Sequence, residues 1–114
     1  MPYFKVSTNL TMSESDKKDF LNQASDTVSQ LLSKPERYVF VEIASGQSLS
    51  MSGSIEPAAY VELKSIGLPE KDTAGFSADL CDFLNQALGI DPERIYIEFI
   101  NNSRHLWGWN SGTF

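Results

Sequence analysis

Proline follows the initiating methionine and directly precedes an apolar run, in the order Met-Pro-Tyr-Phe-Lys-Val. If the methionine is removed, Pro2 carries a free secondary amine that can take a proton from carbon. A free α-amine has a pKa of about 7.7–8.0, and burial among apolar groups or a nearby cation lowers that pKa. Such an amine is mostly neutral near pH 7, as a general base requires. The alternative interpretation is that a proline at a chain end disturbs little.

Cysteine and histidine, which often carry chemistry, each occur once in the sequence. Cys81 alone can form neither an internal disulfide nor a metal cluster, and its place on an apolar helical stripe indicates a small core residue. His105 lies in a polar stretch, which indicates a solvated side chain. The sequence therefore predicts chemistry that needs no metal and no organic cofactor.

The chain that must position Pro2 is short and acidic. Its 114 residues allow a single domain, residues 1–114, with a modest core. Hydrophobic residues make up 41% of the chain and charged residues 21%, which is typical of a folded globular protein. The net charge of −6 repels phosphate backbones, so nucleic acid is not expected as a partner.

Nothing in the sequence predicts a membrane-spanning or export segment. No apolar run reaches the length of about 18 residues that a transmembrane helix needs. The first residues lack the basic start and apolar stretch of a signal peptide. A cytoplasmic protein without a membrane partner is the expected default, and secretion without a leader is the alternative.

Two stretches of the chain share a motif. Residues 34–43 read KPERYVFVEI, and residues 91–100 read DPERIYIEFI. Each stretch gives Pro-Glu-Arg followed by a run of β-branched and aromatic residues, which is typical of a strand. The same motif at the same point of two similar units indicates an internal repeat.

A helical pattern precedes each copy of the motif. Ser13, with Asp16 three residues later, is typical of a capped start of the first helix. Pro69 suits the first turn of the second helix, and Gly89 suits the position after its last turn. The residues expected on the buried faces are Phe20, Leu21, Ala24, Val28, Leu31 and Leu32 in the first helix, and Ala74, Ala78, Cys81, Leu84 and Leu88 in the second, with Leu80 and Ala87 beside that stripe.

A strand-like run also precedes each helix, over residues 2–9 and 58–66. Each unit therefore reads as strand, helix, strand. A helical crossover makes the two strands of a unit parallel and the connection right-handed. Two such units joined together predict an α+β fold with one four-stranded sheet and both helices on one face.

The face of that sheet without helices needs another cover. The runs YVFVEI and IYIEFI read as apolar on both sides of the strand, and the two helices can cover only one side. A second copy of the same chain is the simplest cover. The sequence therefore predicts a closed oligomer.

Five short motifs, in this order and spacing, resemble one known family. They are MPYF at the start, KPERYV after the first helix, LKSIG after the third strand, PERIYIEF in the last long strand and GWNSGTF at the end. Together they resemble the macrophage migration inhibitory factor (MIF) family of the tautomerase superfamily, from Pro2 to Phe114. The resemblance implies two βαβ units with pseudo-two-fold symmetry, a homotrimer whose sheets surround a central channel, and Pro2 as the catalytic base.

The resemblance also implies roles for residues near the proline. Lys34 matches the lysine that holds the carboxylate or carbonyl oxygen of a keto acid, although alone it reads as a cation at a helix C-terminus. Ser65 and Ile66 match the strand end whose backbone lines the pocket, with the Ile66 N–H as an oxygen donor.

Tyr96 and Glu98 stand two residues apart on one strand, so their side chains point to the same face. The resemblance implies that this pair reaches the pocket of the neighbouring subunit, where Tyr96 donates a hydrogen bond to a developing enolate. Glu98 departs from the family, whose better-known members have asparagine there. An ionised carboxylate repels an acidic substrate, whereas a carboxyl with a raised pKa could act as a second acid or base. Both readings stay open.

The resemblance also implies that four residues form the aromatic and apolar rim of the pocket, which are Tyr38, Trp107, Trp109 and Phe114. Trp107 stands where the family has a smaller aliphatic residue, which suits a narrower pocket or flat aryl groups. The alternative is that these side chains pack between subunits. Ala58 and Val61 occupy the positions of a Cys-x-x-Cys pair found in the founding member, so thiol oxidoreductase activity is not expected.

The resemblance implies keto–enol tautomerisation of small α-keto acids such as phenylpyruvate or hydroxyphenylpyruvate. One alternative is a cytokine-like interaction protein with a protein receptor and a vestigial site, which would bind through loops such as 45–55 and 101–106. A second alternative is a related proline-based hydratase or dehalogenase, which Glu98 keeps open.

Overall fold

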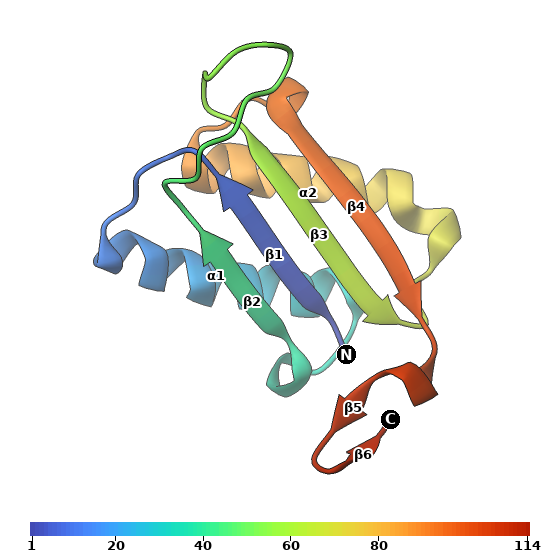
Figure 1. Ribbon diagram of the computed structural model, residues 1–114. Coiled ribbons are helices and arrows are strands. Elements are labelled where there is room, and N and C mark those ends of the chain that lie inside the picture. The colour runs from blue at the N-terminus through green and yellow to red at the C-terminus, as the bar shows by residue number, and fades with distance from the viewer.

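The computed structural model describes residues 1–114, and its centre is a four-stranded mixed sheet with two helices on the same face (Figure 1). The strand order is β2-β1-β3-β4. Strand β1 (Tyr3–Thr8) runs parallel to β2 (Phe40–Ala44) and antiparallel to β3 (Ala59–Ile66), which runs parallel to β4 (Ile95–Asn102). The predicted pair of strand–helix–strand units is therefore confirmed.

Helix α1 (Glu14–Leu32) begins as its sequence predicts. The Ser13 hydroxyl accepts a hydrogen bond from the Asp16 N–H at 3.0 Å, which satisfies one of the unpaired donors of the first turn. Ser33 ends the helix in the left-handed conformation, with a φ of 53°. The helix buries Phe20, Ala24, Val28 and Leu32 against the sheet.

Helix α2 (Thr73–Leu88) begins later than predicted. Pro69 precedes a separate 3₁₀ turn, Glu70–Asp72, and the helix starts only at Thr73. Its end agrees with the prediction, because Gly89 takes a φ of 71°, which glycine adopts without strain.

The buried face of α2 agrees with the prediction from Leu80 onward but differs before it. Leu80 and Leu84 are fully buried, and Phe76 packs against the core. Ala74 and Ala78 are exposed, so their predicted place in the core is wrong. The large side chains set the rotation of the helix, because they have more apolar area to bury than alanine does.

The core fills the space between the two helices and one face of the sheet. The strand residues in it are Phe4, Val6, Ala59, Val61, Leu63 and Ile95. Both Pro-Glu-Arg motifs form a 3₁₀ turn, Glu36–Tyr38 and Pro92–Arg94, each just before a strand of the sheet. The sequence repeat is therefore a structural repeat as well.

The opposite face of the sheet is less apolar than predicted. Phe40 and Tyr96 are 64% and 63% exposed there, but charged side chains alternate with such aromatic ones. Lys5 Nζ lies 3.7 Å from Glu42 Oε2, and the Tyr3 hydroxyl donates to Glu42 Oε1 at 2.7 Å. The expectation that β2 and β4 are apolar on both faces is therefore wrong at Glu42 and Glu98, although exposed aromatic rings remain to be covered.

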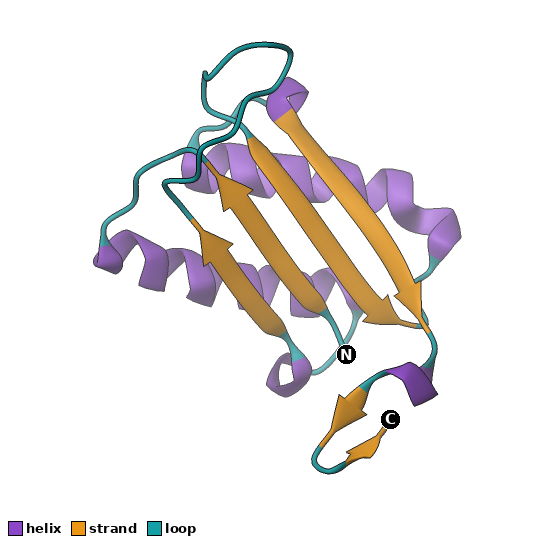
Figure 2. Cartoon of the chain, viewed as in Figure 1, coloured by secondary structure: helices purple, strands orange, loops and turns teal.

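The chain ends in a small ribbon that the sequence did not predict. After a 3₁₀ turn, Arg104–Leu106, strands β5 (Gly108–Trp109) and β6 (Gly112–Thr113) pair with each other. They lie past the end of β4, outside the main sheet (Figure 2). The Phe114 N–H donates to the Trp107 carbonyl at 3.2 Å, which ties the last residue back to the start of the ribbon. Neither helix combines the length and the hydropathy that crossing a membrane requires.

Candidate active site

Pro2 lies at the start of β1, between the two neighbouring strands. The Phe40 N–H donates to the Pro2 carbonyl at 2.9 Å, which fixes the position of the residue. Continuing the β1–β3 register by one residue places Pro2 opposite Ser65. The Pro2 side chain is fully buried. Because proline has no N–H to donate to the sheet, its nitrogen has no structural role in the ladder.

A cavity of about 260 Å³ lies against Pro2. Its ten lining residues are Met1, Pro2, Arg37, Tyr38, Val39, Phe40, Trp107, Gly108, Trp109 and Phe114. The structure therefore brings together the proline and the four residues predicted for the aromatic rim. They come from the start of β1, the first Pro-Glu-Arg turn and the C-terminal ribbon.

The aromatic side chains of this cavity pack on one another. Trp109 and Phe114 stack with ring centroids 5.3 Å apart and planes at 13°. Tyr38 meets both of them edge-on, at 5.7 Å from Trp109 and 5.9 Å from Phe114. Stacked and edge-to-face rings attract each other beyond their burial of area, so the rim is a defined apolar wall.

Two cations lie close to the N-terminal amine. Burial lowers the pKa of that amine below its usual value, and the charges of Lys34 and Arg104 lower the pKa further, because each disfavours a second positive charge. The backbone of Lys34 is fixed by Ser29, whose hydroxyl donates to the Lys34 carbonyl at 2.6 Å. The positive charge of Lys34 therefore acts on the N-terminal amine, although Lys34 does not line the cavity itself.

Ser65 and Ile66 end strand β3 next to the first residues of the chain. Both are buried, and the Ser65 hydroxyl donates to the Ile66 carbonyl at 3.3 Å. The β1–β3 register, continued past its last printed pair, sets Ile66 opposite Met1. Their position at this sheet end agrees with a backbone role near Pro2.

Tyr96 and Glu98 lie far from the Pro2 cavity of their own chain. Tyr96 pairs with Tyr60, whereas Ser65, beside Pro2, pairs with Asn101. Five residues along a strand span about 16 Å, so the Tyr96 side chain cannot reach Pro2 in the same chain. Tyr96 instead lines a separate cavity of about 400 Å³, together with Leu49, Ser50, Met51, Ser52, Ala58, Ala59 and Tyr60.

Glu98 is exposed on the open face of the sheet, near a tyrosine that sequence reasoning did not select. Partial desolvation raises the pKa of the Tyr60 phenol, and the negative charges of Glu98 and Glu62 raise it further. Tyr60 therefore stays protonated at neutral pH and is a hydrogen-bond donor for Glu98. Tyr60 could have been found from the alternation of strand 58–66, which sets it on the same face as Glu62.

Sequence reasoning also missed two arginines of the site. Arg37 lines the Pro2 cavity, although the sequence marked it only as part of a repeated motif. Arg104 acts on the N-terminal amine, although residues 101–106 were considered only as a receptor-binding loop. Their positive charge in an acidic chain was the available signal.

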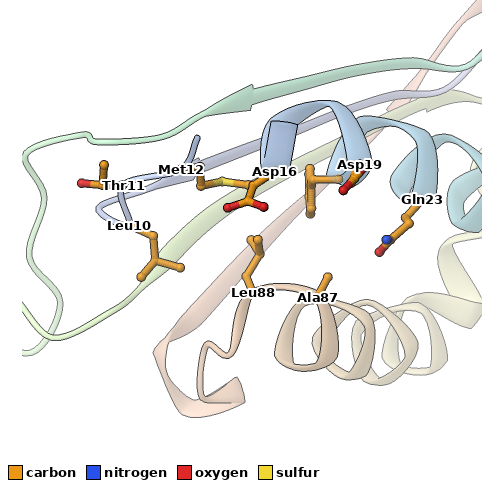
Figure 3. A pocket seen from close by; sticks show the side chains of 9 residues that line it. Leu10, Thr11, Met12, Asp16, Asp19, Gln23, Ala87 and Leu88 are labelled. Atoms are coloured by element: carbon orange, nitrogen blue, oxygen red, sulfur yellow. The ribbon is translucent and has the colours of Figure 1, made fainter. Parts of the chain in front are cut away.

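A further cavity, of about 410 Å³, lies on the helical side between the start of α1 and the end of α2 (Figure 3). Figure 3 shows Asp16, Asp19 and Gln23 around it, with Leu10 and Leu88 among its apolar residues. None of the predicted site residues lines this cavity. Cys81 is half-buried on α2, and burial raises the pKa of its thiol, so it is a poor nucleophile.

The structure has two βαβ units that form one sheet, and a proline at the start of the first strand lies beside an aromatic cavity. These features define the tautomerase-fold class of proteins. The chain belongs to the macrophage migration inhibitory factor (MIF) family, whose sequence model matches residues 1–114. A trimer is consistent with this family.

Individual relatives match over the whole chain. The MIF homolog of Trichinella spiralis is 43% identical over 115 residues, covering 100% of both chains. The MIF of Rattus norvegicus is 33% identical and covers 100% of this chain and 99% of its own. The crystal structure of the homologue from Prochlorococcus marinus superposes with a TM-score of 0.91 at 36% identity, covering 98% of both chains.

Proposed function

We propose that this protein is a keto–enol tautomerase of small α-keto acids such as phenylpyruvate, with Pro2 as general base once Met1 has been removed. Membership of the MIF family supports a MIF-like function. The observation that carries the proposal is the place of Pro2, which is buried against a cavity walled by aromatic rings and bordered by cations.

The proposed reaction moves one proton between carbon and oxygen. The neutral nitrogen of Pro2 takes a proton from the carbon next to the carbonyl, and the electron pair of that C–H bond becomes the enolate. Lys34 and the Ile66 N–H bind the carboxylate and carbonyl oxygens, and Tyr96 donates to the enolate oxygen. The protonated Pro2 then returns the proton to that oxygen, so the base is regenerated.

The electrostatics around the N-terminus favour a neutral base. Burial and the charges of Lys34 and Arg104 lower the pKa of the N-terminal amine. Removal of Met1 moves the free amine to Pro2, which lies deeper against the same cavity. A lowered pKa leaves a larger share of the amine unprotonated at pH 7 and ready to accept a proton.

The proposed site is shared between subunits. Tyr96 lies about 16 Å along the sheet from the level of Pro2, and its own cavity contains no cation. The exposed aromatic rings of the open sheet face give a second copy an apolar surface to cover. We therefore propose a homotrimer in which each Pro2 cavity receives Tyr96 and Glu98 from the neighbouring subunit.

The test is a tautomerase assay on protein whose N-terminus has been checked by intact mass. Processed wild type is expected to ketonise enol phenylpyruvate and enol hydroxyphenylpyruvate. Pro2→Ala and Pro2→Gly are expected to lose most of this activity while retaining the oligomer. A variant with alanine inserted between Met1 and Pro2, which turns the proline nitrogen into an amide, should be equally inactive. Full activity of that insertion variant would refute Pro2 as the base.

A second candidate function is binding to a protein receptor. The two loops considered for it carry exposed apolar side chains, since Ile55 is 83% exposed and Leu106 is 72% exposed. Such side chains at loop tips are typical of contact surfaces. A processed oligomer that lacks tautomerase activity towards both keto acids would favour this function over catalysis.

A further inference from the structure

The two arginines of the repeated Pro-Glu-Arg motif have different environments. Arg94, in the second copy, donates to the carbonyls of Pro57 at 3.0 Å, Met51 at 3.1 Å and Ser54 at 3.0 Å. Its guanidinium therefore holds the loop before β3. Arg37, at the equivalent point of the first copy, makes no hydrogen bond and no ion pair with any residue of the chain, since all side-chain hydrogen bonds of arginine come from Arg94.

Arg37 nevertheless has a defined position at the Pro2 cavity. Its guanidinium carbon lies 4.7 Å from the centre of the Tyr38 ring, which is a cation–π distance. Tyr38 is itself held edge-on by Trp109 and Phe114. Stacking on an aromatic ring uses the face of a guanidinium and leaves its five N–H donors available.

The charge of Arg37 is not neutralised by the residues that line the cavity. These ten residues include no aspartate or glutamate. Lys34 and Arg104 add two further positive charges near the N-terminal amine. Of the nine lysines and arginines of an acidic chain, one thus lines the cavity and two more act on the amine beside it, although a substrate with one carboxylate needs only one of them as its partner.

We propose that Arg37 is a specificity-determining residue that binds a second anionic group of the substrate, and that the site therefore prefers aromatic α-keto acids carrying a second carboxylate. This inference rests on the proposed function of the Pro2 site. Lys34 binds the carboxylate next to the keto group, and Arg37 binds the other carboxylate through two parallel N–H···O bonds, which is the arrangement that guanidinium favours. The aromatic wall holds the ring between the two charges.

The kinetic test compares phenylpyruvate with its 3-carboxy and 4-carboxy derivatives on the processed oligomer. Wild type is expected to have a higher kcat/KM for at least one of the dianionic substrates. Arg37→Gln is expected to lower kcat/KM for that substrate by about 10- to 100-fold, mainly through KM, and to lower the value for phenylpyruvate by a clearly smaller factor. Arg37→Lys, which keeps the charge but not the paired donors, should recover part of the loss.

A binding test separates this inference from the proposed reaction. Calorimetry is carried out with benzoate, isophthalate and terephthalate, which carry one or two carboxylates and cannot react. Wild type is expected to bind one of the diacids at least about tenfold more tightly than benzoate, and Arg37→Gln should remove that difference. Wild type that fails to turn over any keto acid but passes this test would overturn the reaction and not the role of Arg37.

The same measurements can overturn the inference. Equal binding of mono- and diacids by wild type, or equal losses for all substrates in Arg37→Gln, would show that Arg37 does not select a second anionic group. Arg37→Gln is expected to fold normally, because Arg37 makes no hydrogen bond in the chain. Its thermal midpoint, measured beside wild type, confirms that any loss of affinity arises at the site.

Discussion

At the scale of single residues, the proposed chemistry of the site depends on the charges that act on one nitrogen, that of Pro2. The Pro2 nitrogen donates no hydrogen bond to the sheet, so it has no structural role there. In the proposed mechanism, the charges of Lys34 and Arg104, which lower the pKa of the Met1 amine, also favour the neutral form of the Pro2 amine once Met1 is removed. In the same proposal these cations attract the carboxylate of a keto acid, so one arrangement of charge serves both base activation and substrate binding.

The first prediction concerns Arg104. A lowered amine pKa means that kcat/KM rises with pH along a limb whose midpoint lies below the ordinary value of about 7.7–8.0. Arg104→Gln removes one cause of that lowering, so the midpoint is expected to move to higher pH. Activity should therefore fall most on the acidic side of the midpoint and approach the wild-type value above it. The measurement is kcat/KM for phenylpyruvate from pH 5 to pH 9.

Lys17→Gln is the control for this prediction. Lys17 lies in the first turn of α1 and is paired with Glu14, so it lies about 25 Å along the helix axis from Lys34. Its removal changes the net charge by the same amount but should leave the midpoint unchanged. A midpoint that moves equally in both variants would indicate a general charge effect and not a local one.

Residues of the site were predictable where a short motif fixed them. Lys34 and the aromatic residues near the C-terminus follow from the resemblance. The structure sets the aromatic residues around the Pro2 cavity, and the charge of Lys34 acts on the N-terminal amine. Arg37 was not predictable as a site residue, because its sequence environment matches that of Arg94. Only the three-dimensional arrangement shows which arginine meets backbone carbonyls and which meets the cavity.

At the scale of elements, the two copies of the βαβ unit show how a repeat acquires different tasks. Each Pro-Glu-Arg turn leads into a strand at an edge of the sheet, β2 or β4. The second turn faces the loop before β3, whose carbonyls Arg94 binds. The first turn faces the N-terminus and the C-terminal ribbon, and these three segments together line the Pro2 cavity.

The second prediction tests this division with matched variants. Arg94→Gln removes several hydrogen bonds from a charged donor and is expected to lower the free energy of unfolding by about 1–3 kcal/mol. Arg37→Gln removes only a cation–π contact and is expected to lower it by about 1 kcal/mol or less. Urea unfolding of both variants beside wild type measures the two values. A larger loss in Arg37→Gln than in Arg94→Gln would contradict the structural assignment of the two arginines.

The elements themselves were predictable to different degrees. The Ser13 cap and the apolar face of α1 were predicted correctly because large apolar residues recur with the helical period. The start of α2 was predicted too early because Pro69 suits both a helix and a 3₁₀ turn. The C-terminal ribbon was missed because its strands are two residues long and show no alternation.

At the scale of the whole molecule, we propose that one subunit holds parts of two sites. Its Pro2 cavity lies at one end of the sheet, and its Tyr96 cavity lies about 16 Å further along, on the open face. The exposed Phe40, Tyr60 and Tyr96 rings lie on this face. In this proposal, a neighbouring copy that covers the rings also brings its own Tyr96 to the Pro2 cavity of another subunit. Activity then depends on assembly of the oligomer.

The third prediction is that two inactive variants restore each other in mixed oligomers. Subunits with Pro2→Ala keep Tyr96, and subunits with Tyr96→Ala keep Pro2. In a cyclic trimer formed from an equal mixture, about one quarter of the sites pair an intact Pro2 with an intact Tyr96 from the next subunit. Co-refolded mixtures should therefore regain about one quarter of wild-type tautomerase activity, whereas each variant refolded alone should not. Exchange of subunits raises activity only if Pro2 and Tyr96 of different subunits form one site. A mixture no more active than the mean of its two parents would therefore contradict the shared site.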